Sequence, residues 1–332
     1  MSASPPPAHD EPFEGELPEP KFAEAQQWNL TDGSYGVIYH VGSFPGDLKL
    51  WHNAFAVTFP DGTTYATKVV GRSEPRMFGT PTVHTVTLDP YKKWKIRFDG
   101  AMRRYRHEDL WRAPGTDGEH IPAVIELEVT ATEPVWEPGP RKEEAANSLF
   151  KTQYRLHHEQ PLRARGVIRV GDQTIEFDGV GHRDHSQGPR ERTTLRGLWV
   201  NATFESGWAF LAMEGLRDPG GQFERSAIWE GGNVLPAALQ SFPPLEVTAP
   251  RPLQFELPIL DDAGRLRKIE ITRTHGVTWF GTGPTEWCVG TDLSQPNNYI
   301  YTHYFAEFVC DGEKGIGFVD QGARASHLRL PD

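Results

Sequence analysis

Apolar and polar residues alternate along short segments of this chain, and turn-forming residues separate the segments. Residues 124–131 are apolar at every odd position and mostly polar at the even ones. A period of two is typical of a β-strand with one buried face. Two hairpins are predicted with particular clarity, residues 55–67 around Pro60-Asp61-Gly62 and residues 198–213 around Glu205-Ser206-Gly207. The pattern therefore predicts an all-β fold built from antiparallel hairpins.

The length of the chain predicts more than one domain. A chain of 332 residues exceeds what a single hydrophobic core usually organises. Residues 1–24 are rich in proline and acidic residues, which predicts a disordered or loosely attached tail. We expect two packed, lipocalin-like antiparallel β-barrel or sandwich domains at residues 25–190 and 191–332, with the boundary in the charged stretch 187–196. Very little helix is expected, about two turns at residues 143–150.

Charge and cysteine content narrow the function classes. The chain has 34 Lys and Arg against 45 Asp and Glu, a net charge of -11, which disfavours nucleic acid as a partner. Two cysteines, Cys288 and Cys310, give neither a disulfide framework nor a Cys-rich zinc site. The sequence has no apolar run long enough for a membrane span and no secretory signal, so we expect a soluble, cytoplasmic protein. It also lacks a phosphate-binding glycine loop, which disfavours a nucleotide cofactor.

The segment Gly181-His182-Arg183-Asp184-His185-Ser186 carries the densest group of ionisable side chains. Three interpretations are open: a metal site formed by His182, Asp184 and His185, an acid/base pair, or a solvated domain junction. In an extended chain His182 and Asp184 share one side, whereas His185 faces the other. This geometry favours a His/Asp pair over a three-ligand cluster, and no metal is predicted.

Three further segments could line a binding site. His158 and Glu159 lie in a polar strand, with a solvated sheet edge as the alternative. The aromatic strand that starts at Tyr299 places Tyr301, His303 and Glu307 on one face, where a core histidine is as plausible as a pocket residue. Residues 198–204 place Trp199 and Asn201 opposite an apolar face, which suits contact with a mostly apolar ligand.

The stretch of residues 179–190 resembles the signature of the hydroxyneurosporene synthase (carotenoid 1,2-hydratase) and AttH-like superfamily. In that family a Gly-rich strand end runs into an Arg/His-Asp-His-Ser/Asn-aromatic-Gly segment, here ending at Arg190. Residues 158–160, 94–100 and 198–199 add to the similarity. The resemblance implies two packed lipocalin-like domains, an apolar cavity near their interface, chemistry without metal or organic cofactor, and a proton donor at Asp184. His182 and Gln187 stand where hydratases often have aromatic residues, which indicates an uncharacterised branch.

Together these observations predict a cofactor-independent hydratase, isomerase or cyclase that acts by acid/base chemistry on a hydrophobic, isoprenoid- or polyketide-like molecule. A carrier of a lipophilic ligand and a structural protein are the alternatives; an acid/base group inside an apolar cavity favours the enzyme. A homodimer is compatible with the sequence. The predicted catalytic residues are Asp184, His182 and His185, and the predicted substrate-binding residues are Trp199, Asn201, His158, Glu159, Arg190, Tyr301 and His303.

Overall fold

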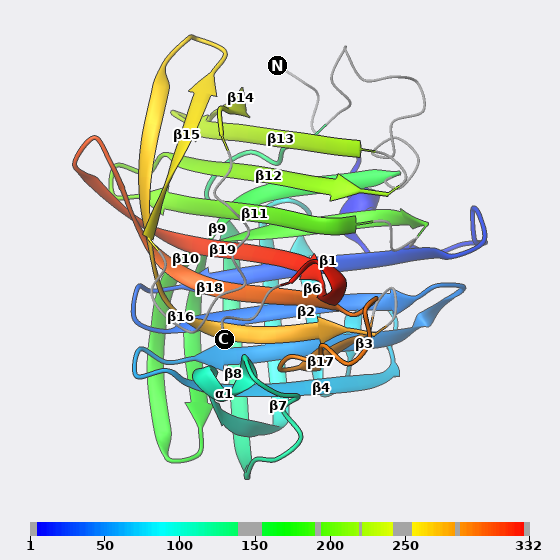
Figure 1. Cartoon of the computed structure of the whole chain (residues 1–332). Helices are drawn as coiled ribbons and strands as arrows, with labels where there is room; N and C mark the ends of the chain where they lie inside the picture. Colours follow the sequence, from blue (N-terminus) through cyan, green and yellow to red (C-terminus); the bar gives the residue numbers. More distant parts are fainter. Residues whose placement is uncertain are drawn as a thin grey trace.

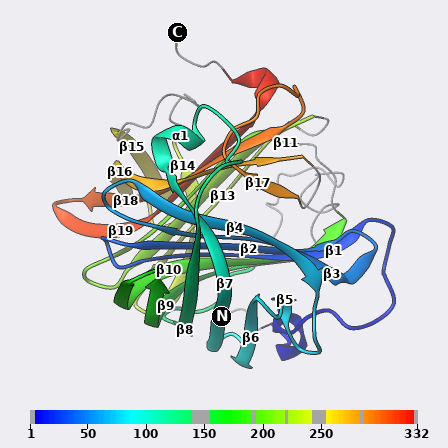
Figure 2. The same ribbon diagram turned by 90° about the horizontal axis from the view of Figure 1, so that it is seen from below.

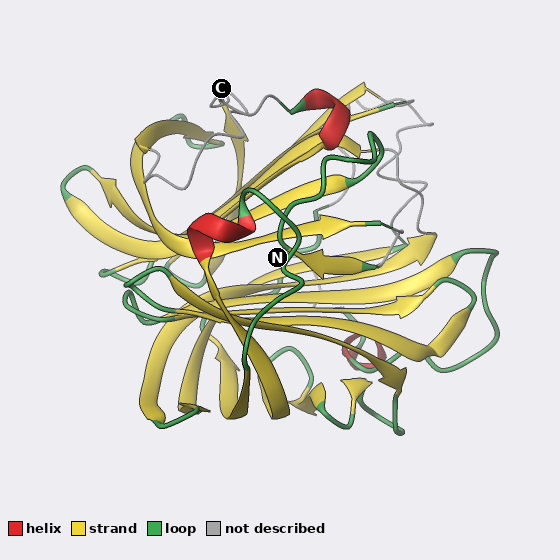
Figure 3. Cartoon of the chain, turned by 60° about the horizontal axis from the view of Figure 1, so that its bottom comes forward, coloured by secondary structure: helices red, strands yellow, loops and turns green. Residues whose placement is uncertain are grey.

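The structure is a computed structural model that describes residues 5–138, 155–189, 194–218, 221–241, 254–282 and 286–328. Within these ranges the chain forms two antiparallel β-sheets (Figure 1). Helical structure there is confined to three short segments, η1 (Pro7–Asp10), α1 (His107–Leu110) and η2 (Ala325–His327), visible in Figure 3. The predicted all-β fold with very little helix is confirmed. The helix predicted at residues 143–150 lies outside the described residues.

The first sheet has ten strands and contains a closed barrel. Its strands follow one another in the order β4-β3-β2-β1-β10-β9-β8-β7-β6-β5, and an additional pairing of β4 with β7 closes the first eight into a ring. The strands are β1 (Phe22–Thr31), β2 (Gly36–Phe44), β3 (Asp47–Thr58), β4 (Thr63–Arg72), β5 (Phe78–Thr80), β6 (Val83–Asp89), β7 (Lys93–Arg106), β8 (His120–Ala131), β9 (Leu156–Val170) and β10 (Gln173–Pro189).

The second sheet has nine strands in the order β15-β14-β13-β12-β11-β19-β18-β16-β17. An additional pairing of β15 with β16 closes the first eight of them into a second barrel. The strands are β11 (Thr194–Phe204), β12 (Ala209–Arg217), β13 (Gly221–Glu230), β14 (Asn233–Leu239), β15 (Gln254–Asp261), β16 (Leu266–Gly281), β17 (Trp287–Val289), β18 (Tyr299–Cys310) and β19 (Glu313–Arg324). The chain passes from the first sheet to the second between Pro189 and Thr194. This crossing falls within the stretch where the sequence predicts a domain boundary; that each half is a domain in its own right stays a prediction.

Strands β1 to β4 lie between the rest of the first barrel and the second sheet (Figure 2). This position explains the difference between strands that alternate and strands that are buried throughout. In β8, only every second residue from Ala123 to Val129 is buried, because its other face meets solvent. In β1 all ten residues are buried, because one face points into the first barrel and the other toward the second sheet.

Hydrophobic clusters fill both barrels and the layer between them. Trp28, Phe55 and Trp94 belong to the core of the first barrel, and Phe210 and Phe308 to that of the second. A third cluster joins the two sheets; it contains Ile38, Ala54, Trp279, Trp287, Phe305 and Phe318. Burial of these large apolar surfaces is the main force that holds the sheets together.

The N-terminal segment differs from its prediction as a disordered tail. Residues 7–10 form η1, Asp10 is fully buried, and β1 begins at Phe22, inside the predicted tail. The composition of the segment gives no reason to fold by itself, and its order comes from polar partners in the first barrel. Among the described residues, no helix is long and apolar enough to cross a membrane.

Candidate functional site

A cavity of ≈ 290 Å³ opens between the two sheets. Strands β1, β9 and β10 supply one wall, and β11, β12, β18 and β19 supply the other. Four acidic side chains, Glu159, Asp184, Glu214 and Asp320, line it together with aromatic rings that include Trp199 and Tyr301. Its volume lies near the lower end of the usual range for small-molecule sites, roughly 300–1,000 Å³.

The first wall carries a cluster of one histidine and two carboxylates. Strands β9 and β10 pair antiparallel, which places Asp184 opposite Glu159 and Ser186 opposite His157, so all four side chains point the same way. His157 Nε2 lies 2.8 Å from Glu159 Oε1 and 3.2 Å from Asp184 Oδ2. His157 and Glu159 are buried, whereas 23% of the Asp184 side chain is exposed. Asp184 is therefore the most exposed member of the cluster and the one most open to a cavity ligand.

His182 stands behind this cluster. Its Nε2 lies 2.9 Å from Glu159 Oε2, so the Glu159 carboxylate bridges His157 and His182. The His182 ring packs edge-on against Trp199 and Trp229, with centroid separations of 5.8 and 5.6 Å. His182 thus supports the cluster through Glu159 and fixes it against the second sheet.

The surroundings of His157 favour its protonated form. Burial by itself would lower the pKa of its imidazole, but the hydrogen bonds and negative charges of Asp184 and Glu159 outweigh burial and raise that pKa well above its usual value. Both carboxylates approach the same ring nitrogen, Nε2, so its N–H is shared between them and provides a proton that can move at the edge of the cavity.

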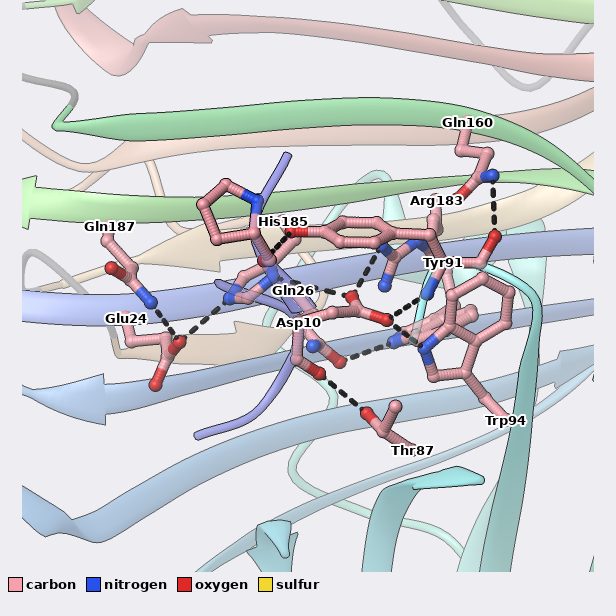
Figure 4. A network of polar contacts seen from close by, with 12 residues as sticks. Asp10, Glu24, Gln26, Thr87, Tyr91, Trp94, Gln160, Arg183, His185 and Gln187 are labelled. Atoms are coloured by element: carbon pink, nitrogen blue, oxygen red, sulfur yellow. Dashed lines mark hydrogen bonds and ion pairs between the residues drawn. The ribbon is translucent and has the colours of Figure 1, made fainter. Parts of the chain in front are cut away.

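The opposite face of β10 serves a different purpose. Arg183 and His185 point away from the cavity, as the alternation along the strand requires, and both are fully buried. Figure 4 shows their network. Arg183 Nη2 lies 2.6 Å from Asp10 Oδ1, and the Arg183 guanidinium lies 4.2 Å from the centre of the Trp94 ring. His185 Nε2 lies 2.8 Å from Glu24 Oε1.

Asp10 is held by more than the ion pair. Its Oδ2 accepts hydrogen bonds from the backbone N–H of Tyr91 at 2.7 Å and from Trp94 Nε1 at 3.0 Å. Its carbonyl oxygen accepts the Thr87 hydroxyl at 2.7 Å. One face of β10 therefore binds the N-terminal segment, and the other face presents Asp184 to the cavity.

The geometry separates the predicted site residues into two groups. The cavity brings together Asp184, Glu159, Trp199 and Tyr301, and His182 touches this group through Glu159. His158, His185, Asn201 and His303 are buried outside the described lining of the cavity. Burial, with smaller contributions from His185 and Arg183, lowers the pKa of His158 to about 2, so it packs as a neutral ring. Arg190 lies outside the described residues.

The second wall combines stacked aromatic rings with another His–Asp pair. Tyr301 stacks on Trp287 at a centroid separation of 4.5 Å. His303 and Asp320 are paired across β18 and β19, and His303 Nε2 lies 3.5 Å from Asp320 Oδ2. Asp320 lines the cavity, whereas Glu307, which shares a strand face with His303, is exposed.

Sequence reasoning missed His157 and Asp320. A usable signal was present for both, because a two-residue turn fixes the register of the hairpin around it. The turn at Gly171-Asp172 places residue 184 opposite 159 and residue 186 opposite 157. The turn at Asp311-Gly312 places His303 opposite Asp320 in the same way.

His157, Glu159 and Asp184 also offer three ligand atoms within 4.8 Å of one another, a spacing that a metal ion could use. The hydrogen-bonding distances from His157 Nε2 to both carboxylates fit a shared proton equally well. The sequence predicts chemistry without a metal, and this stays a prediction.

The shared proton predicts a pH dependence of folding stability. Because the pKa of His157 is raised in the folded state, that state holds the proton at pH values where the unfolded chain, with a histidine pKa of about 6.5, has lost it. The stabilisation is complete below about pH 6.5 and is lost as the pH rises through the folded pKa, by about 1 kcal/mol per pH unit. Urea unfolding from about pH 7 to 9 should show this decline in the wild type and a shallower one in His157→Gln.

His327→Gln, which changes an exposed histidine, is the matched control and should keep the wild-type slope. A wild-type curve that changes after chelator treatment would indicate a metal in place of the proton, and equal slopes for all variants would contradict the proton assignment.

Comparison with known proteins places the chain in a family and identifies its fold. A family model described as a domain of unknown function, DUF7064, matches residues 19–323. None of the curated proteins matches.

Three solved structures are similar in fold. A putative AttH from Nitrosomonas europaea has a TM-score of 0.58 at 13% identity, covering 90% of this chain and 91% of the other. CghA has a TM-score of 0.54 at 11% identity and covers 95% of both chains; it has also been solved with Sch210972. Kievitone hydratase from Nectria haematococca has a TM-score of 0.50 at 10% identity, covering 92% and 89%. At these identities the likeness concerns the fold, and it agrees with the expected AttH-like, double-lipocalin architecture.

Proposed function

This chain belongs to the DUF7064 family, and we propose that it is an enzyme that moves protons to and from a hydrophobic small molecule held between its two sheets. The reaction class is that of a hydratase, isomerase or cyclase working without an organic cofactor or metal. The observation that carries this proposal is the position of Asp184, whose carboxylate lies at the wall of the cavity and 3.2 Å from the buried His157 imidazole.

In this mechanism Asp184 exchanges a proton with the substrate and His157 resupplies or removes it. The raised pKa of His157 keeps a proton available near neutral pH, which is the condition for general acid catalysis there. Glu159 shares the same Nε2–H of His157 and keeps the imidazole directed at Asp184. His182, bonded to the far oxygen of Glu159, holds that carboxylate in place.

The cavity supports a compact, partly flat substrate. Its ≈ 290 Å³ suits a small isoprenoid- or polyketide-like molecule better than a long polyene. Trp199 and Tyr301 provide apolar faces on which an unsaturated system can lie, and aromatic faces also stabilise developing positive charge. One structure of similar fold is a hydratase, and CghA has been solved with Sch210972; the former supports this reaction class, as does the sequence resemblance to hydroxyneurosporene synthase.

Incubation in ¹⁸O-labelled water tests the reaction class. The purified chain is mixed with a panel of linear monoterpene alcohols, prenylated phenols and conjugated enones, and the products are analysed by mass spectrometry. A hydratase adds one labelled water to a panel member, and an isomerase or cyclase returns a product of unchanged mass but altered retention. The activity must disappear in Asp184→Asn; product formation that survives this change would count against the proposed site.

A carrier of a lipophilic ligand is the second candidate, favoured by the stacked aromatic wall at Tyr301 and Trp287. A carrier would bind a panel member tightly and release it unaltered. The same incubation, followed by native mass spectrometry, separates the two functions.

A further inference from the structure

Asp320 faces the cavity from the wall opposite Asp184. Asp184 lies on β10 of the first sheet and Asp320 on β19 of the second, and both line the same cavity. Asp320 resembles Asp184 in its surroundings: 22% of its side chain is exposed, and a buried histidine, His303, stands beside it. Two carboxylates, each backed by a histidine, thus approach the cavity from two different sheets.

The His303–Asp320 pair makes fewer hydrogen bonds than the His157–Asp184 pair. Among the described residues, neither His303 Nδ1 nor His303 Nε2 has a hydrogen-bond partner, and Asp320 Oδ1 accepts no hydrogen bond. The distance from His303 Nε2 to Asp320 Oδ2, 3.5 Å, is longer than a hydrogen bond of normal strength. Buried polar groups without partners are costly, so they are expected where a ligand or a water completes them.

The surroundings of His303 hold it in place without using its nitrogen atoms. Its ring packs against Trp287 and Phe318, at centroid separations of 5.3 and 5.2 Å. An imidazole fixed in this way 3.5 Å from a carboxylate at a cavity wall limits where that carboxylate can lie, and a small movement would join the two by a hydrogen bond.

We propose that Asp320 is a second proton-transfer residue, positioned by His303, and that the substrate is a flat unsaturated molecule that reacts on its two faces between Asp184 and Asp320. This inference rests on the proposed function and assigns the acid and the base to different residues. Asp184 already shares the proton of His157 and serves as the acid, whereas Asp320, whose side chain is 22% exposed at the opposite wall, serves as the base.

For a hydration the step balances as follows. The π electrons of the substrate C=C bond form a new C–H bond with the proton of the Asp184 carboxyl, which is left as carboxylate. The oxygen of a water molecule forms a bond to the other carbon and gives a proton to Asp320. The net change is addition of one water, and a proton returned from Asp320 through solvent to the His157–Asp184 pair restores the enzyme. Because the two residues act from opposite walls, hydrogen and hydroxyl arrive on opposite faces of the substrate.

A base-sensitive probe tests the assignment independently of the natural substrate. The compound 5-nitrobenzisoxazole is flat and compact, and it opens when a base removes its ring C–H proton: the electron pair forms a nitrile as the N–O bond breaks, giving a coloured phenolate. The wild-type chain should accelerate this reaction over buffer. Asp320→Asn should lose that acceleration by about 10²-fold or more, a usual contribution of a general base.

Matched variants decide between the two carboxylates. Glu307→Gln, an exposed acid on the neighbouring strand, should keep the wild-type rate, and Asp184→Asn should lose less of it than Asp320→Asn. Asp320→Glu, which retains a carboxylate, should recover part of the rate and guards against a folding defect in Asp320→Asn. A wild-type rate equal to buffer, or an unchanged rate in Asp320→Asn, overturns the inference.

The inference and the proposed function can fail separately. A probe rate lost in Asp184→Asn but kept in Asp320→Asn overturns the role of Asp320 and leaves the enzyme proposal standing. An Asp320-dependent probe rate without any product from the labelled-water panel overturns the proposed reaction class and leaves the base assigned.

Discussion

Replacement of Asp184 by Asn is expected to reduce turnover of the chain's substrate by about 10²–10⁴-fold, the usual contribution of general acid/base catalysis. Asparagine keeps the size of the side chain but can neither hold nor release the proton that His157 supplies at 3.2 Å. Substrate binding should survive, because the cavity keeps its shape and its aromatic wall. Steady-state kinetics together with an equilibrium binding measurement checks both parts of this expectation.

Asp178→Asn is the matched control, because it makes the same change on the same strand at an exposed ion pair with Arg163. It should leave turnover unchanged. If Asp184→Asn lowered the melting temperature, binding and turnover together, the residue would have a structural role. Full turnover in Asp184→Asn would remove the residue from the mechanism.

Replacement of Asp10 by Ala should lower the free energy of unfolding by about 3–5 kcal/mol, because it leaves a fully buried guanidinium without its counterion. The change also removes the acceptor for Tyr91 N–H and Trp94 Nε1–H. Urea unfolding measures the loss. Asp47→Asn breaks an exposed pair with Arg72 and should cost no more than about 1 kcal/mol.

A double variant separates the effect of the Asp10–Arg183 ion pair on stability from the effect of side-chain packing. Arg183→Met alone leaves Asp10 buried without its cation, but Asp10→Ala combined with Arg183→Met removes both charges. The combined loss should therefore be smaller than the sum of the two single losses. Simple additivity would show that the ion pair does not couple the N-terminal segment to β10.

The strands could be predicted from the sequence because their pattern is local. The alternation of Ile125, Leu127 and Val129 is visible in a short window, and all three are buried as expected. The same local rule placed His182 and Asp184 on one face of β10 and His185 on the other. His185 was nevertheless predicted as catalytic from its residue type, whereas the structure pairs it with Glu24 away from the cavity.

The site could be predicted only in part, because the residues that complete it lie far apart in the sequence and meet only in the folded chain. Asp10 lies in a proline-rich acidic segment, and nothing near it indicates burial; its partner Arg183 is far along the chain. His157 acquires its importance from carboxylates on two strands, and Asp320 from a cavity that exists only when the sheets pack. The turns at residues 171–172 and 311–312 fix which residues face each other across each hairpin, and so pair Asp184 with Glu159 and His303 with Asp320. They do not show that the two hairpins form opposite walls of one cavity.

The two-sided use of β10 has a consequence for how this family can change its length over evolution. One residue inserted or deleted within residues 182–187 would rotate the following side chains to the other face, exchanging a cavity acid for an anchor of the N-terminal segment. A single insertion or deletion would thus remove both the cavity acid and the attachment of the N-terminal segment at once. We expect relatives to gain and lose residues at the turn before β10 or after Pro189, while the spacing from His182 to Gln187 stays constant.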